Sequence, residues 1–176
     1  MILKNLETER LFLKNIDISD RDFIFKHFSD ENVNKYLFDA EPVTNISDAD
    51  EIISVYLKSE ERNQHRWIII DKIKNIKMGT CGFHKWNKIN AEIEIGYDLG
   101  MQFWKKGYMY EALDKILTLL RDEMSIKEIN ACIFVENIDS IRLIEKLNFK
   151  ISGTYNEVFR IKEYLHSIYT LNIERQ

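Results

Sequence analysis

The sequence is poor in residues that break or crosslink a chain: 176 residues include one proline, six glycines and two cysteines. So little proline and glycine excludes a collagen-like or low-complexity disordered chain. Cys81 and Cys132 lie in separate apolar segments, so we expect buried, reduced thiols and no disulfide framework. The four histidines have no metal-ligand spacing with each other or with the cysteines. We therefore predict no metal site.

Long apolar runs and excess positive charge are also missing. No run approaches the roughly 20 apolar residues that span a bilayer, and the first ten residues lack the apolar core of a secretory signal. We therefore predict a cytoplasmic protein without a membrane partner. The net charge of −4 argues against non-specific binding to nucleic acid. The length suits one domain, residues 1–176.

Apolar periodicity predicts seven strands and four helices. The expected strands are Arg10–Ile16, Trp67–Ile73, Lys77–Trp86, Ala91–Leu99, Lys127–Val135, Phe149–Ser152 and Arg160–Ile173, and the expected helices are Ile18–Phe28, Ser47–Arg62, Met109–Met124 and Asn137–Asn148. Ser19 is the expected N-cap of the first helix, and Ser47 or Asp48 that of the second. Hairpin strands followed by a strand–helix–strand unit indicate an α/β (α+β) fold, with a mixed sheet and helices on its faces.

The segment between the first two helices has no regular period and combines acids with the aromatic Tyr36 and Phe38. It is either a plain surface connection or one wall of a substrate groove, because binding residues are common on loops. Tyr36 and Phe38 are therefore candidate substrate-binding residues.

The segment from Ala91 to Glu111 (AEIEIGYDLGMQFWKKGYMYE) reads as a strand, a turn and the start of a helix. Alternation places Ile93, Ile95 and Tyr97 on one face of the strand and Glu94 on the other. The N–H groups of such a turn, together with the helix dipole, favour a phosphate or pyrophosphate. The pattern predicts a phosphate-bearing ligand beside a carboxylate that can act as a base.

Five segments resemble motifs of the GNAT superfamily of acetyl-CoA-dependent N-acetyltransferases, and most closely its RimJ/RimL-type branch. They are LETERLFLK (6–14), GTCGF (79–83), EIGY (94–97), WKKGYMYEAL (104–113) and NIDSIRLIEKLNF (137–149). The resemblance covers nearly the whole chain. It implies a mixed, mostly antiparallel sheet of about seven strands that splays between the fourth and fifth, with about four helices on its faces. Acetyl-CoA would lie between the splayed strands.

The resemblance also implies which residues hold acetyl-CoA. Backbone groups on the strand would pair with the pantetheine arm, amides of the following turn would hold the pyrophosphate, and the next helix would supply further contacts. The candidate cofactor-binding residues are Tyr97, Leu99, Trp104, Lys105, Lys106, Gly107, Tyr108, Met109, Asn137 and Ser140.

Acetyl transfer to an amine needs a base, stabilisation of the oxyanion and a proton for the leaving thiolate. Glu94 is the candidate base and substrate contact, in surroundings expected to raise its pKa, and Glu92 is a weaker rival. Many GNAT enzymes have a tyrosine acid where this chain has Ile144. Ser140 is the best remaining hydroxyl for that catalytic role, although a role limited to hydrogen bonding is the stronger alternative. Tyr97 reads as a packing and backbone position.

Two functions stay open at this point. The first is an N-acetyltransferase that works by direct attack in a ternary complex. Its acceptor is a protein N-terminus, which needs an open groove, or a small amine such as a polyamine, amino acid or antibiotic, which favours a closed pocket. The second is a non-catalytic acetyl-CoA-binding sensor or interaction module. Residues 30–41 and 155–163 should line the acceptor groove, and dimers are common in this branch, so a homodimer is compatible with the resemblance.

Overall fold

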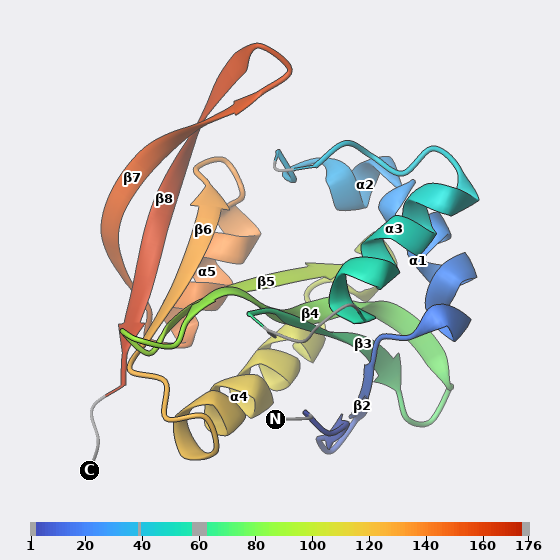
Figure 1. Ribbon diagram of the computed structural model, residues 1–176, viewed down its shortest axis with the longest axis horizontal. Helices are drawn as coiled ribbons and strands as arrows, with labels where there is room; N and C mark the ends of the chain where they lie inside the picture. Colours follow the sequence, from blue (N-terminus) through green and yellow to red (C-terminus); the bar gives the residue numbers. More distant parts are fainter. Residues whose placement is uncertain (1–2, 39, 58–62, 174–176) are drawn as a thin grey trace.

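The computed structural model describes residues 3–38, 40–57 and 63–173 (Figure 1). The strands are β1 (Leu6–Glu7), β2 (Leu11–Asn15), β3 (His65–Asp71), β4 (Ile76–Asn87), β5 (Glu92–Leu99), β6 (Glu128–Phe134), β7 (Lys150–Phe159) and β8 (Lys162–Asn172). The α-helices are α1 (Arg21–Phe28), α2 (Glu31–Asn34), α3 (Ile46–Leu57), α4 (Tyr108–Asp122) and α5 (Ile138–Lys146), and short 3₁₀ helices η1 (Ile18–Asp20) and η2 (Met101–Phe103) precede α1 and α4. The sequence patterns do not predict β1 and α2, because such short segments show no period. The expected end of the second helix, residues 58–62, lies outside the described residues.

All eight described strands form one sheet in the order β1-β2-β3-β4-β5-β6-β8-β7. Every neighbouring pair is antiparallel except β5 and β6. These two parallel strands pair only from Glu92–Glu128 to Glu94–Asn130. Beyond this point β5 continues beside β4, and β6 continues beside β8. The predicted splay is therefore confirmed; it falls between β5 and β6 because β1 adds one strand to the count.

Helices cover both faces of the sheet (Figure 1). Ile116 of α4 belongs to the core on one face, whereas Ile53 of α3 belongs to the core on the other. β3 lies between the two layers, so Trp67 and Ile69 face the first core while Ile68 faces the second. Burial on both faces explains why this strand is a continuous apolar run.

Two predicted N-caps are wrong. The side chain of Asp17 accepts a hydrogen bond from the Ser19 N–H at 2.7 Å, so Asp17 caps η1 and Ser19 lies inside the turn. At α3, the side-chain oxygen of Asn45 accepts from the N–H groups of Ser47 and Asp48. In both places a short polar side chain two or three residues before the predicted cap takes its role.

The predicted ends of α5 are confirmed. Asn137 is its N-cap and accepts a hydrogen bond from the Ser140 N–H at 3.3 Å. Asn148, just after the helix, has a φ of 68°. This is the left-handed conformation that ends many helices and that asparagine tolerates.

Candidate functional site

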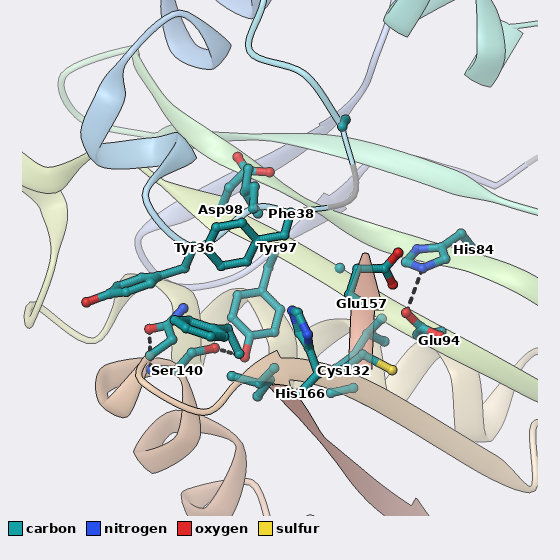
Figure 2. A pocket seen from close by; sticks show the side chains of 18 of the residues that line it. Tyr36, Phe38, His84, Glu94, Tyr97, Asp98, Cys132, Ser140, Glu157 and His166 are labelled. Carbon is teal, nitrogen blue, oxygen red and sulfur yellow. Dashed lines mark hydrogen bonds and ion pairs between the residues drawn. The ribbon is translucent and has the colours of Figure 1, made fainter. Parts of the chain in front are cut away.

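A cavity of about 540 Å³ lies where β5 and β6 diverge. Its walls come from β5, β6, the start of α5, the segment before α3, and β7, as Figure 2 shows for many of its side chains. The predicted site residues that line it are Tyr36, Phe38, Glu94, Tyr97, Asn137 and Ser140. The fold thus brings the candidate base, the candidate hydroxyl and the candidate aromatic contacts to one place.

The other predicted cofactor-binding residues do not line this cavity but lie around the turn into α4: Leu99, Trp104, Lys105, Lys106, Gly107, Tyr108 and Met109. The indole of Trp104 donates to the Leu99 carbonyl at 2.6 Å, so this carbonyl already has a partner. The ammonium group of Lys106 donates a hydrogen bond to the backbone carbonyl of Gln102 at 2.6 Å. The side chain of Met109 is buried in the core. A ligand at this turn would therefore meet mainly backbone groups.

The turn itself has the shape of an anion site. Gly107 is the N-cap of α4, with a φ of 78° that favours glycine, and no side chain of the described residues caps the N–H groups of this helix. The dipole of a 15-residue helix adds positive potential at these groups. Lys105 lies nearby, and its ammonium is 3.7 Å from the carboxylate of Asp139 at the start of α5. These features fit a pyrophosphate.

Glu94 is held by two basic side chains of β4. Its carboxylate accepts from His84 at 3.0 Å and from Lys85 at 2.9 Å. Burial raises the pKa of Glu94, but these hydrogen bonds and charges outweigh it and bring the pKa to about 2. The expectation of a raised pKa is therefore wrong. Strand pairing places His84 opposite Glu94, and an irregularity after His84 turns Lys85 toward it, which sequence spacing does not reveal.

Glu157 is a carboxylate that the sequence analysis did not single out. It lies on β7, lines the same cavity, and is half-buried near His84 and Glu94 (Figure 2). Among the described residues, no hydrogen bond or ion pair involves its carboxylate. The prediction ended this strand at Ser152, whereas β7 continues to Phe159. Alternation along the longer strand would have placed Tyr155 and Glu157 on one face.

A buried ionic network around Asp98 of β5 forms part of the cavity wall. The carboxylate of Asp98 accepts from Arg66 at 3.0 Å and from the Thr80 hydroxyl at 2.6 Å, and His27 Nε2 lies 2.6 Å from its other oxygen. Burial raises the pKa of Asp98, but the charges of His27 and Arg66 and the hydrogen bonds from His27 and Thr80 outweigh it and lower the pKa. The network joins α1 to three strands and fixes this part of the wall.

Tyr97 and Ser140 form a hydroxyl pair in the cavity. Their oxygens lie 2.6 Å apart, which links β5 to the first turn of α5. Burial raises the pKa of Tyr97, and the hydrogen bond with Ser140 lowers it by less. The net pKa is raised, so the phenol is protonated at neutral pH. Ile144 is fully buried and offers no acid. The side chain of Tyr97 therefore does more than pack.

Cys132 also lines the cavity, but its surroundings do not activate it. Burial and the nearby Glu94 raise the pKa of its thiol to about 11. The thiolate, which is the nucleophilic form, is therefore rare at neutral pH. In the described part of the chain, no cluster of three His, Cys, Asp or Glu side chains could hold a metal ion, and no helix is long and apolar enough to span a membrane.

Comparison with known proteins gives both sequence and structural relatives. Residues 10–150 match the family described as Acetyltransferase (GNAT) domain. The chain is 33% identical over 172 residues to the uncharacterized N-acetyltransferase p20 of Bacillus licheniformis, a match that covers 97% of this chain and 96% of that protein.

The solved structures that share the fold include two acetyltransferases bound to coenzyme A. RimL, a ribosomal alpha-N-protein acetyltransferase solved with coenzyme A, has a TM-score of 0.83 and 20% identity, over 94% of this chain and 96% of that one. Spermidine N-acetyltransferase from Vibrio cholerae, solved with CoA and spermine, has a TM-score of 0.79 and 19% identity, over 92% and 95% of the two chains.

Proposed function

The chain belongs to the GNAT acetyltransferase family, and from that membership we propose that it moves the acetyl group of acetyl-CoA to a primary amine by direct attack in a ternary complex. The predicted enzyme class, an acetyl-CoA-dependent N-acetyltransferase, is confirmed by family membership. The proposal of direct transfer to a primary amine depends mainly on one observation. The carboxylate of Glu157, which forms no hydrogen bond or ion pair with the described residues, lines the same cavity as the Tyr97–Ser140 hydroxyl pair.

Acetyl-CoA would bind along two features already described. The N–H groups at the start of α4, with Gly107 before them, would hold its pyrophosphate. Its pantetheine arm would lie between β5 and β6. The edge of β5 after Glu94 has no strand beside it on that side within the described residues. Its backbone groups are therefore available to an extended arm, much as a sheet edge accepts an added strand.

Glu157 would receive the proton of the acceptor. A primary amine is mostly protonated near neutral pH and must lose a proton before its nitrogen can attack. Glu94, with a pKa of about 2 and two basic partners, is a weak base. Glu157 forms no hydrogen bond or ion pair among the described residues, and only the more distant charge of Lys85 acts on it, so it can accept both the substrate ammonium and its proton. Glu94 would instead hold His84 and Lys85 in the wall.

The remaining steps follow from the reaction's proton balance. The neutral amine attacks the thioester carbonyl, the C–S bond breaks, and the thiolate leaves. The Tyr97–Ser140 pair would give this thiolate a proton through Ser140 Oγ, with the phenol donating to Ser140 in turn. Of the two protons that the ammonium loses, the thiol gains the equivalent of one and solvent receives the other. Direct transfer fits a site where the Cys132 thiol is not activated.

A thiol-release assay on matched variants tests this assignment. Glu157→Gln should lower kcat about 100-fold, because it removes a general base, while acetyl-CoA affinity measured by calorimetry stays unchanged. Glu163→Gln is the control, since Glu163 is an exposed carboxylate on the same hairpin and does not line the cavity. A larger loss in Glu94→Gln than in Glu157→Gln would return the base role to Glu94. Acetyl-CoA binding without thiol release with any amine would favour the non-catalytic alternative.

A further inference from the structure

The two walls of the cavity touch each other where Phe38 and Glu41 meet the β7–β8 hairpin, on the two segments expected to line the acceptor groove. Phe38, before α3, stacks on Tyr164 of β8, with ring centroids 3.8 Å apart and planes inclined by 14°. Glu41 forms an ion pair with Arg160 in the turn of the β7–β8 hairpin. Phe38 and Glu41 both line the cavity. These contacts bridge the cavity from side to side, so the acceptor enters a bridged pocket and not an open groove.

The volume of the pocket also limits the acceptor. The cavity of about 540 Å³ must hold the thioester end of the donor as well as the amine. Pockets of roughly 300–1,000 Å³ bury one drug-sized ligand. The space that the donor leaves therefore suits a small molecule better than several residues of a polypeptide.

The charges in the pocket limit the number of ammonium groups that an acceptor can carry into it. Four carboxylates line it: Glu41, Glu94, Asp98 and Glu157. Arg160 pairs with Glu41, and basic side chains of the protein hold Glu94 and Asp98 as described above. Within the described residues, Glu157 is the one lining carboxylate that forms no hydrogen bond or ion pair, and only the more distant charge of Lys85, which is already bound to Glu94, acts on it. A polyamine would bring two or more ammonium groups, and at least one of them would lack a counter-charge.

Aromatic rings gather on two sides of the cavity wall. The Phe134 ring lies 4.9 Å from Phe38 in an edge orientation and 6.1 Å from Tyr36. On the β7–β8 side, His166 stacks on Tyr155 with centroids 5.3 Å apart. Such rings attract flat apolar groups and also cations near their faces. A short alkylamine would leave much of this aromatic surface in contact with water.

We propose that the acceptor is a small amine with a single ammonium group and a flat apolar body, and that polyamines and protein N-termini are poor acceptors. This inference rests on the proposed acetyltransferase function and defines its substrate class. Glu157 would bind the ammonium group, and the rings around Phe38 and Phe134 would bind the body.

Thiol-release kinetics with four probes test the proposal: 2-phenylethylamine, butylamine, spermidine and a tetrapeptide with a free N-terminus. The kcat/KM of wild type for 2-phenylethylamine should exceed that for each of the others by about tenfold or more, the size of one good aromatic contact. Phe38→Ala should reduce the ratio of 2-phenylethylamine to butylamine. Ile161→Ser is the control at the exposed tip of the hairpin and should keep the ratio of wild type.

A second variant tests the bridge and leaves every ring that lines the cavity in place, although Arg160 also lies over the ring of Phe159, which does not line the cavity. Arg160→Ala removes the ion pair with Glu41 at an exposed site, so it should raise the kcat/KM for the tetrapeptide relative to 2-phenylethylamine. The proposal is overturned if spermidine or the tetrapeptide is the best acceptor, or if butylamine equals 2-phenylethylamine. Acetyl-CoA binding with no thiol release in any of the four reactions would instead contradict the acetyltransferase function itself.

Discussion

The hydroxyl of Tyr97 lies 2.6 Å from Ser140 Oγ, across the point where β5 and β6 separate. Because burial raises the pKa of Tyr97, its phenol is protonated and can donate to Ser140. Ser140 can then direct its own proton into the cavity, toward a leaving sulfur. This pair can supply the proton that the buried Ile144 cannot.

Variants of this pair should show that the two hydroxyls act together. Ser140→Ala should lower kcat about 100-fold, since it removes the proposed acid. Tyr97→Phe should lower kcat about tenfold, the effect of one lost hydrogen bond of roughly 1.4 kcal/mol. The double variant should be no slower than Ser140→Ala alone. Steady-state kinetics at saturating acetyl-CoA measure these effects, and strictly additive losses would contradict a shared role.

The network around Asp98 should contribute strongly to stability. In Asp98→Asn, Arg66 keeps its charge but loses its carboxylate partner inside the protein. Removing one partner of a buried ion pair costs about 3–5 kcal/mol, so the free energy of unfolding in urea should fall by that amount. Asp122→Asn is the control, because Asp122 pairs with Arg121 on the surface and should matter little. Equal urea midpoints for the two variants would show that the network is not needed for stability.

Local periodicity in the sequence predicts most strands and helices, and the order of the motifs predicts the fold. The alternation in β5 places Ile93 and Ile95 in the core and Glu94 on the opposite face, as the structure confirms. The strand after α5 is different. Most side chains of β7 are exposed or half-buried, so its apolar pattern is weak and its true end at Phe159 is not visible in the sequence. Residues 155–163 are expected to line the groove, and Tyr155 and Glu157 do line the cavity, but for this reason Glu157 is not singled out as a site residue from the sequence.

Other features of the site depend on contacts between distant segments. Glu94 has a low pKa because β4 brings His84 and Lys85 beside it, and a local irregularity in the strand pairing decides the position of Lys85. Tyr97 meets Ser140 only because β5 and α5 pack together, although the two residues are 43 positions apart in the sequence. Residue types and spacings predict on which face of a strand or helix each side chain lies. They do not predict which side chain of another element it contacts.

Glu94→Gln should change how stability depends on pH. The pKa of Glu94 is about 2 in the folded protein, against an ordinary value of 4.5. A lowered pKa stabilises the fold fully above pH 4.5, and this contribution disappears as the pH falls toward 2. At neutral pH the variant should therefore be less stable than wild type by roughly 3 kcal/mol, with the difference vanishing near pH 2. Urea unfolding across this range measures it. Stability curves of wild type and variant that run parallel down to pH 2 would contradict the assigned ion pairs.

Three substitutions at Gly107 should separate backbone shape from charge in the turn before α4. Its φ of 78° is tolerated by asparagine but strains alanine, and an added Cβ would lie 3.4 Å from the nearest atom, on Arg10. Gly107→Asn should keep acetyl-CoA affinity within a few-fold, and Gly107→Ala should lose slightly more. Gly107→Glu should lose about 100-fold, because like charges placed together at a binding site cost several kcal/mol. Arg10 would not neutralise the new carboxylate, since it already binds Glu111 at 2.6 Å. Calorimetry at low and high salt measures these affinities, and salt should reduce the loss in Gly107→Glu only. Affinity equal to wild type in Gly107→Glu would place the pyrophosphate elsewhere.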